Sequence, residues 1–211
     1  MSRIIKIELN KSKKKVILHF DDSTSLIVGY TTANRNSLHT GMDISSEQKK
    51  EMVHANELQG CLEKAIRLLA YRPRSELEIK QYLYKHGYRN NTIDETMEKL
   101  KSQDLVNDED FASYWRDNRL SLNPKSRRML KYELKSKGIT GELVENTLST
   151  VDDLTAAYNA GFKKARILPT DNYTEFIKRV SDHLKWRGFD FEVISTVAKQ
   201  LWHDMQKVGI I

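Results

Sequence analysis

The chain has 211 residues, of which 39% are hydrophobic and 30% charged, and this composition excludes a disordered chain while providing apolar side chains for several small cores. Lys and Arg number 35 against 29 Asp and Glu, so the net charge of +6 favours an acidic partner such as nucleic acid or a membrane surface. The single cysteine, Cys61, excludes an internal disulfide and a zinc site built on cysteines. Because the start MSRIIKIELNK lacks the apolar run of a signal peptide and no segment approaches the roughly 18 apolar residues of a membrane span, we expect a cytoplasmic protein.

The first 30 residues alternate between apolar and polar side chains, which is typical of β-strands with one covered face. We expect an antiparallel meander of three strands joined by the polar turns NKSKK and DDST. The covered face is predicted to carry Ile5, Ile7 and Leu9, then Val16, Leu18 and Phe20, then Leu26, Val28 and Tyr30. Residues 31–46 are expected to form a loop with one further extended piece near Met42.

After Ser45 the apolar period changes to 3.6 residues, which indicates helices. The first apolar stripe ends before Pro73, and Ser75 is placed as the N-cap of a second helix. Gly87 falls where a left-handed C-cap would end that helix, and Thr92 is placed as the cap of a third helix. The pattern therefore predicts a unit of three helices.

The three-helix unit occurs three times. Its marks are a glycine, a leucine four residues earlier and an aliphatic residue six residues later: Leu83, Gly87 and Ile93; Leu134, Gly138 and Val144; Leu184, Gly188 and Ile194. Each copy also contains one of the three prolines, Pro73, Pro124 and Pro169, and the third copy has an insertion around residues 168–172. Agreement in three copies is typical of a repeat protein. We predict a meander with its loop at residues 1–45, a lead-in helix with the first repeat at 46–106, a second repeat at 107–150 and a third at 151–211.

The predicted fold is mainly α, with tandem three-helix-bundle repeats in an elongated, curved array and a small N-terminal antiparallel β-meander. Three short helices enclose little core, so we expect neighbouring repeats to stack and to share apolar faces. The largest side chains available for this packing are Trp115, Trp186 and Trp202.

Positive charge is concentrated in residues 111–138, which contain eight bases and two acids, whereas residues 90–110 contain two bases and seven acids. The basic segment also contains aromatic side chains, and this combination suits a phosphate backbone or the acidic surface of a protein bound to one. The alternative is that these bases are only solvated helix faces. The residues predicted to contact a partner or DNA are Arg72, Arg74, Arg116, Arg119, Lys125, Arg127, Arg128 and Lys131.

Signatures of catalysis are missing from the sequence. It contains no P-loop and no GxGxxG motif, and its six histidines do not have metal-ligand spacing. Asp108, Glu109 and Asp110 follow Asn107, where the start of a helix favours carboxylates, so we interpret them as helix-terminus residues. We therefore expect no catalytic, cofactor-binding or metal-binding residues.

Three segments carry a resemblance to a known family: AIRLLAYRPRSELEIKQYLYKHGY, IDETMEKLKSQDLVNDEDFASYWRDNR and NPKSRRMLKYELKSKGI. They resemble the regulatory RecX family, closely from Leu62 to about Ile139 and more loosely through the third copy. The resemblance implies tandem three-helix repeats and a monomer that binds the RecA recombinase on its single-stranded-DNA filament. It also implies inhibition of filament extension, ATP hydrolysis and recombination, and so modulation of DNA repair and the SOS response, without catalysis. Some members of the family also bind DNA directly.

Two other functions are compatible with the residues alone. One is a general basic nucleic-acid-binding protein that acts by competition for DNA. The other is a helical adaptor for a different protein, in which the bases only contact water.

Overall fold

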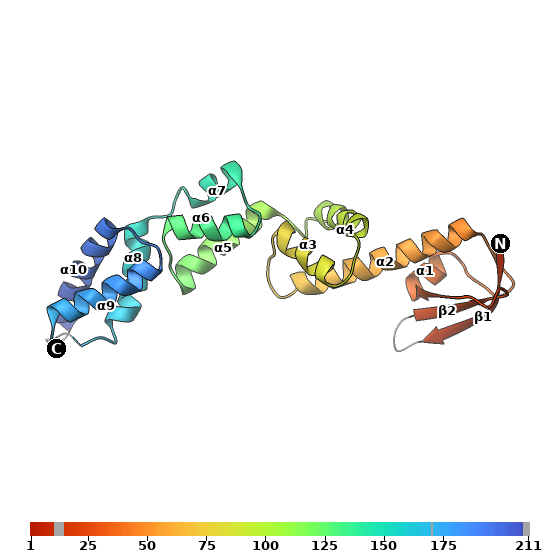
Figure 1. Ribbon diagram of the computed structural model, residues 1–211, viewed down its shortest axis with the longest axis horizontal. Helices are drawn as coiled ribbons and strands as arrows, with labels where there is room; N and C mark the ends of the chain where they lie inside the picture. Colours follow the sequence, from red (N-terminus) through yellow and green to blue (C-terminus); the bar gives the residue numbers. More distant parts are fainter. Residues whose placement is uncertain (11–14, 170, 209–211) are drawn as a thin grey trace. The chain divides into compact units, whose positions relative to one another are not determined.

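The computed structural model describes residues 1–10, 15–169 and 171–208, and within these it is mainly helical, with four strands and ten helices (Figure 1). The predicted first turn and the predicted insertion near residue 170 lie partly outside the described residues. The chain divides into two compact units. Unit 1 comprises residues 1–72 and 79–106, and unit 2 comprises residues 73–78 and the chain from residue 107 on.

The predicted antiparallel sheet is confirmed, with a fourth short strand. Its strands are β1 (Ser2–Asn10), β2 (Lys15–Phe20), β3 (Ser25–Gly29) and β4 (Asp43–Ile44), in the order β3-β2-β1-β4. The covered face of β2 is as predicted, since Val16, Leu18 and Phe20 are buried. In β3 Val28 is buried as predicted, but Tyr30 lies beyond the end of the strand and is 48% exposed, so the prediction for Tyr30 was wrong. In β1 the prediction was wrong at two positions, because Ile5 and Leu9 are 56% and 55% exposed while Ile4 is buried. The register shifts between Ile4 and Lys6, and this β-bulge moves the covered face by one residue.

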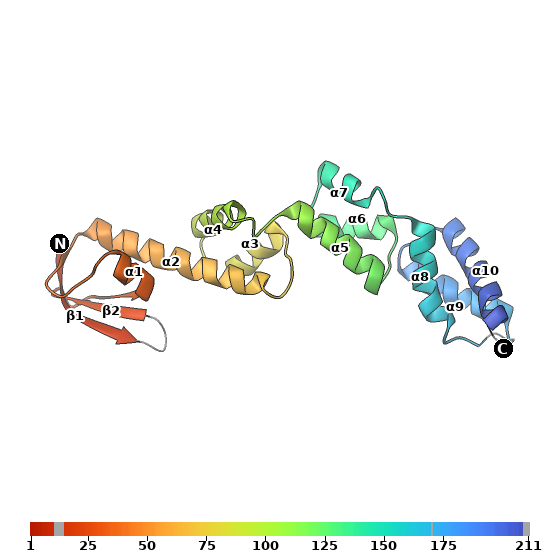
Figure 2. The same cartoon turned by 180° about the vertical axis from the view of Figure 1, so that it is seen from behind.

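Two helices pack against the sheet. The expectation of a loop at residues 31–46 was wrong in part, because Tyr30–Arg35 form the short helix α1, and β4 is the extended piece expected near Met42. The second helix is α2 (Ser46–Leu69), and its N-cap is Ser45, whose side chain forms a capping box with Gln48. Figure 1 and Figure 2 both show α2 extending from the sheet to α4.

α2 belongs to two cores of unit 1. Near its start Met52 is buried with the apolar side chains of the sheet. Further along, Cys61 and Ala65 are buried with the helices of the first repeat, α3 (Glu76–Lys85) and α4 (Asn90–Ser102). One uninterrupted helix therefore joins the sheet to the first repeat.

The turns of the first repeat follow the sequence signals in most respects. The Ser75 hydroxyl accepts a hydrogen bond from the Glu78 amide (3.2 Å), and Gly87 has φ +85°, so the N-cap and the left-handed C-cap are confirmed. The prediction for Thr92 was wrong. α4 begins at Asn90, only three residues after Gly87, so Thr92 lies inside the helix and is buried.

Unit 2 contains six further helices in two groups of three, which Figure 2 shows from behind. They are α5 (Asp108–Leu122), α6 (Arg127–Ser136), α7 (Gly141–Leu148), α8 (Asp153–Ala165), α9 (Tyr173–Trp186) and α10 (Phe191–Val208). Each group encloses its own core, and Leu120 packs against both. The signature leucines and the glycine turns recur as predicted, since Leu134 and Leu184 are fully buried and Gly138 and Gly188 have φ of +87° and +83°.

The tryptophans do not all pack as predicted. Trp115 and Trp202 are partly buried against the cores of their groups. Trp186 is 84% exposed, so its predicted packing role was wrong. It lies two residues after the buried Leu184, which on a helix is about 200° around the axis and therefore on the solvent side.

Candidate functional site

Two of the predicted site residues, Arg119 and Lys125, surround the carboxylate of Glu133 on α6. Arg119 Nε lies 2.8 Å from Glu133 Oε2, Lys125 Nζ pairs with Oε1, and the Trp115 indole N–H donates to Oε2 at 2.8 Å. We call Trp115, Arg119, Lys125 and Glu133 the Glu133 cluster. Burial raises the pKa of Glu133, but hydrogen bonds from Lys125, Trp115 and Arg119 outweigh burial and hold it below its ordinary value. Because these bonds join α5 and the Pro124 turn to α6, Arg119 and Lys125 stabilise the packing within the second repeat.

Arg116 also has partners within its own repeat. Its Nη1 donates to the Thr147 carbonyl oxygen at the end of α7 (3.0 Å), and its Nε lies 2.7 Å from the Asp117 carboxylate. The side chain is 22% exposed. Arg116 therefore satisfies a carbonyl in the last turn of α7, where a helix leaves such groups unpaired.

The outward side of α6 brings the remaining bases of the segment together. We call it the α6 basic face, and it consists of Arg127, Arg128, Lys131, Tyr132 and Lys135. At 3.6 residues per turn these residues span about 140° around the helix, and the buried Leu130 and Leu134 lie outside that range. The side chains of Arg127, Arg128 and Lys131 are 45%, 72% and 40% exposed. Three of the eight predicted residues therefore lie side by side on an accessible surface.

The charges of this face are only partly compensated. Lys131 pairs with Glu145, and Arg127 lies 4.0 Å from the same carboxylate. Arg128 lies 3.9 Å from Asp190, and Lys135 forms no ion pair with any residue that the structure describes. The hydrogen bond from Lys131 is the main cause that lowers the pKa of Glu145. Four bases thus face two carboxylates, which leaves a positive surface.

The third repeat fixes the start of α6. Ser126 caps the helix, since its hydroxyl accepts from the Met129 amide at 3.2 Å. The Arg127 amide donates to Asp153 Oδ1 (2.7 Å), and Arg128 Nη2 donates to the Gly188 carbonyl oxygen (3.1 Å). The α6 basic face is therefore held in place by backbone and side-chain contacts with the next repeat.

Arg72 and Arg74 flank Pro73 in the loop between α2 and α3. Both are partly buried, and the Nε of Arg74 is buried without a hydrogen-bond partner among the described residues. Neither belongs to α6, so the sequence prediction grouped residues from two separate segments.

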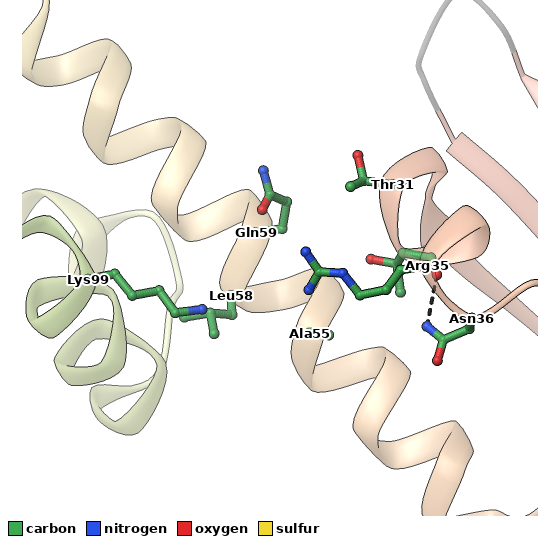
Figure 3. A pocket seen from close by; sticks show the side chains of 8 residues that line it. Thr31, Arg35, Asn36, Ala55, Leu58, Gln59 and Lys99 are labelled. Atoms are coloured by element: carbon green, nitrogen blue, oxygen red, sulfur yellow. Dashed lines mark hydrogen bonds between the residues drawn. The ribbon is translucent and has the colours of Figure 1, made fainter. Parts of the chain in front are cut away.

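The cavities of unit 1 lie away from the predicted residues. One of about 770 Å³ follows α2 and is lined by residues such as Asn56, Glu63 and Tyr88. A smaller one of about 100 Å³ lies between α1, α2 and α4, where Arg35 and Lys99 point toward one another (Figure 3). None of the eight predicted residues lines either cavity. The candidate site is an exposed helix face, which suits a macromolecular partner better than a small ligand.

The described parts of the chain contain no group of three or more His, Cys, Asp or Glu side chains that could hold a metal ion. Nor does any described helix combine the length and the hydropathy needed to cross a bilayer.

Comparison with known proteins gives the same family for both of the first two repeats. Residues 61–100 match the first three-helix domain of RecX, and residues 107–148 match the second. The chain is 30% identical over 195 residues to the regulatory protein RecX of Geobacillus kaustophilus, across 90% of this chain and 72% of the relative. It is 26% identical over 205 residues to the RecX protein of Clostridioides difficile, across 95% and 96% of the two chains.

Solved structures share the fold. A crystal structure of a regulatory protein RecX superposes with a TM-score of 0.66 at 20% identity, covering 94% of this chain and all of the other. The crystal structure of RecX from Lactobacillus salivarius gives a TM-score of 0.58 at 24% identity, covering 70% of this chain and 97% of the other. The resemblance in the sequence motifs is therefore confirmed, and the chain belongs to the RecX family of regulatory proteins.

Proposed function

We propose that this protein binds the filament that the RecA recombinase forms on single-stranded DNA and inhibits filament extension, ATP hydrolysis and recombination. It thereby modulates DNA repair and the SOS response. Membership of a family of regulatory proteins supports a role in regulation. In this proposal the protein acts in the cytoplasm, as a monomer, and by binding rather than catalysis.

The α6 basic face is the observation that carries the choice of partner. Its four bases outnumber the carboxylates near them, and it is built on a helix that the neighbouring repeat holds in place. An exposed, positive surface is complementary to a phosphate backbone or to an acidic protein surface that borders one. A filament presents such surfaces repeatedly, so modest contacts from several repeats would act together at high effective concentration.

The eight predicted residues then separate by role. We propose Arg127, Arg128 and Lys131 as the main contacts with the filament. Arg116, Arg119 and Lys125 contribute by holding the second repeat together, because they are less exposed than the α6 bases and their charged groups bind acids and a carbonyl of that repeat. Arg72 and Arg74 remain proposed contacts from the loop before α3.

The test is the ATPase rate of the cognate RecA on single-stranded DNA, with this protein added at amounts below that of RecA. The wild-type protein is expected to lower the rate. Arg127→Gln/Arg128→Gln is expected to require about tenfold more protein for the same effect, because two partner contacts lose their charge. The matched control is Lys50→Gln/Arg67→Gln, which removes the same charge from exposed pairs of α2 and should leave inhibition unchanged.

Each alternative function predicts a different result. If the rate falls only when the protein is abundant enough to coat the DNA, competition for DNA explains the effect, and DNA binding should then weaken steeply with salt. If the rate stays flat at all amounts and the protein has no affinity for DNA, the proposal is wrong and an adaptor for another protein takes its place.

A further inference from the structure

The second helix of each repeat carries one aromatic side chain that is more than two-thirds exposed. Tyr84 on α3 is 68% exposed, Tyr132 on α6 71% and Trp186 on α9 84%. They stand three, six and two residues before the glycine that follows their helix. When the three second helices are aligned on these glycines, a helix of 3.6 residues per turn directs Tyr132 within about 60° of the direction of each of the other two aromatic residues. Tyr84 and Trp186 differ from one another by about 100°, so the three aromatic side chains share the solvent half of the second helix with Tyr132 between the other two directions.

Among the residues that the structure describes, Trp186 differs from the other two tryptophans in having no partner for its ring. The ring of Trp115 lies under Arg119 (4.3 Å) and Lys137 (4.1 Å), and the ring of Trp202 contacts Phe176 edge to face with centroids 5.2 Å apart. Trp186 makes no ring contact with any residue in the described parts of the chain. Both faces of its indole are therefore available to a partner.

Positive charge accompanies these exposed rings in unit 2. Tyr132 belongs to the α6 basic face, with Arg128 and Lys131 on the preceding turn and Lys135 on the next. Trp186 directly follows the exposed Lys185 at the end of α9. The nearest acid on this side of α9 is Asp182, one turn earlier. An open aromatic face next to a base matches a partner that presents flat apolar groups beside negative charges.

Single-stranded DNA presents both groups, because its bases are unpaired and its phosphates lie beside them. A duplex hides the faces of its bases in the stack, so it offers only phosphates and base edges. We propose that Tyr132 and Trp186 stack on unpaired bases of single-stranded DNA, while Lys185 and the bases of the α6 basic face contact its phosphates. This inference deepens the proposed function and rests on it for the identity of the partner. Because every base has a π face, binding should depend little on sequence.

The test compares two strands that differ only in their bases. One is an oligothymidylate of about 16 nucleotides, and the other is an abasic strand of the same length and charge. Trp186→Ala should weaken binding to the oligothymidylate by about 5- to 100-fold in fluorescence anisotropy and leave binding to the abasic strand unchanged. Trp186→Phe should recover part of the loss because it restores an aromatic face. The exposure of Trp186 makes either change harmless to the core.

Two control variants separate stacking from other effects. Phe191→Ala removes an aromatic side chain that is 83% exposed in the same repeat but outside the second helix, and it should change neither affinity. Arg127→Gln/Arg128→Gln should weaken binding to both strands by the same factor, because both strands carry the phosphates.

The other outcomes overturn the inference. Equal losses on both strands with Trp186→Ala would mean that the indole does not contact bases. A loss of RecA inhibition with unchanged DNA affinity would assign Trp186 to a protein contact, and the proposed function would stand without stacking. Conversely, a base-dependent loss in a protein that never slows the RecA ATPase would keep the stacking and reject the proposed function.

Discussion

Lys137 Nζ lies 2.6 Å from Glu78 Oε1, and less than one-fifth of each side chain is exposed to solvent. The pair joins the first turn of α3 to the end of α6, beside the turn at Gly138. Lys137 also lies 4.1 Å from the Trp115 ring centroid, so one cation connects the ion pair to the Glu133 cluster. These contacts hold residues 76–78, the first turn of α3 and a part of unit 2, against the second repeat.

Glu78→Gln should lower the free energy of unfolding by about 2 kcal/mol, because it leaves the ammonium of Lys137 mostly buried without its counter-charge. All three tryptophans lie in unit 2, so urea unfolding followed by their fluorescence measures the change there. The control is Arg179→Gln, which removes an ion pair whose side chains are about half exposed and should cost less than about 0.5 kcal/mol. Equal effects of the two variants would show that the Glu78–Lys137 pair contributes no more than a surface pair.

Gly138→Ala should lower the free energy of unfolding more than Gly87→Ala does. Both glycines have left-handed φ, so each change costs about 1 kcal/mol for that reason alone. A Cβ at Gly138 would lie 2.8 Å from the Cβ of Leu77, whereas one at Gly87 would meet no atom within 4 Å. We expect Gly138→Ala to lose about 3 kcal/mol in all. Thermal unfolding of the wild type and the two variants measures the difference, and equal losses at the two glycines would contradict it.

Glu133→Gln should destabilise the protein by about 2–3 kcal/mol at neutral pH, because Arg119 and Lys125 lose the charge they share. The pKa of Glu133 is lower in the folded protein than its ordinary value of 4.5, so its stabilising contribution is complete above that value. The contribution is lost as the pH falls through the lowered pKa. The gap in stability between wild type and variant should therefore narrow below about pH 4. The matched control is Asp182→Asn, which removes one acidic charge at an exposed position of α9 and should change the free energy of unfolding little at neutral pH.

Much of the fold followed from local patterns. The leucine, glycine and aliphatic positions of each repeat predicted buried side chains and left-handed turns because both depend on a few neighbouring residues. Thr92 was misplaced because the start of α4 depends on how soon the helix can resume after Gly87. The prediction for β1 placed the covered face one residue too late at Ile5 because the strand contains a bulge. A bulge depends on pairing with the partner strand, so the sequence of one strand does not indicate it.

The candidate site was predictable only as a segment. Eight bases in residues 111–138 indicated a positive surface, but their sequence does not indicate which of them bind acids of the same repeat. Glu133 takes Arg119 and Lys125 from 14 and 8 residues away, and such pairings depend on how α5 packs on α6. Trp186 could have been assigned to solvent from its spacing alone, because it follows Leu184 by two residues on a helix whose buried side was already known.

The helix α2 contributes Met52 to the core of the sheet and Cys61 to the core of the first repeat. A change that destabilises the sheet should therefore also lower the stability of the first repeat. A hydrogen-bonded helix transmits unwinding along its length more readily than a loop would, so the two cores of unit 1 should open as one cooperative block. In native-state hydrogen exchange, the slowest amides of β2 and of α4 should then share one free energy of opening. A chain that lacks the sheet should therefore have a less stable first repeat, because α2 would lose the core in which Met52 is buried.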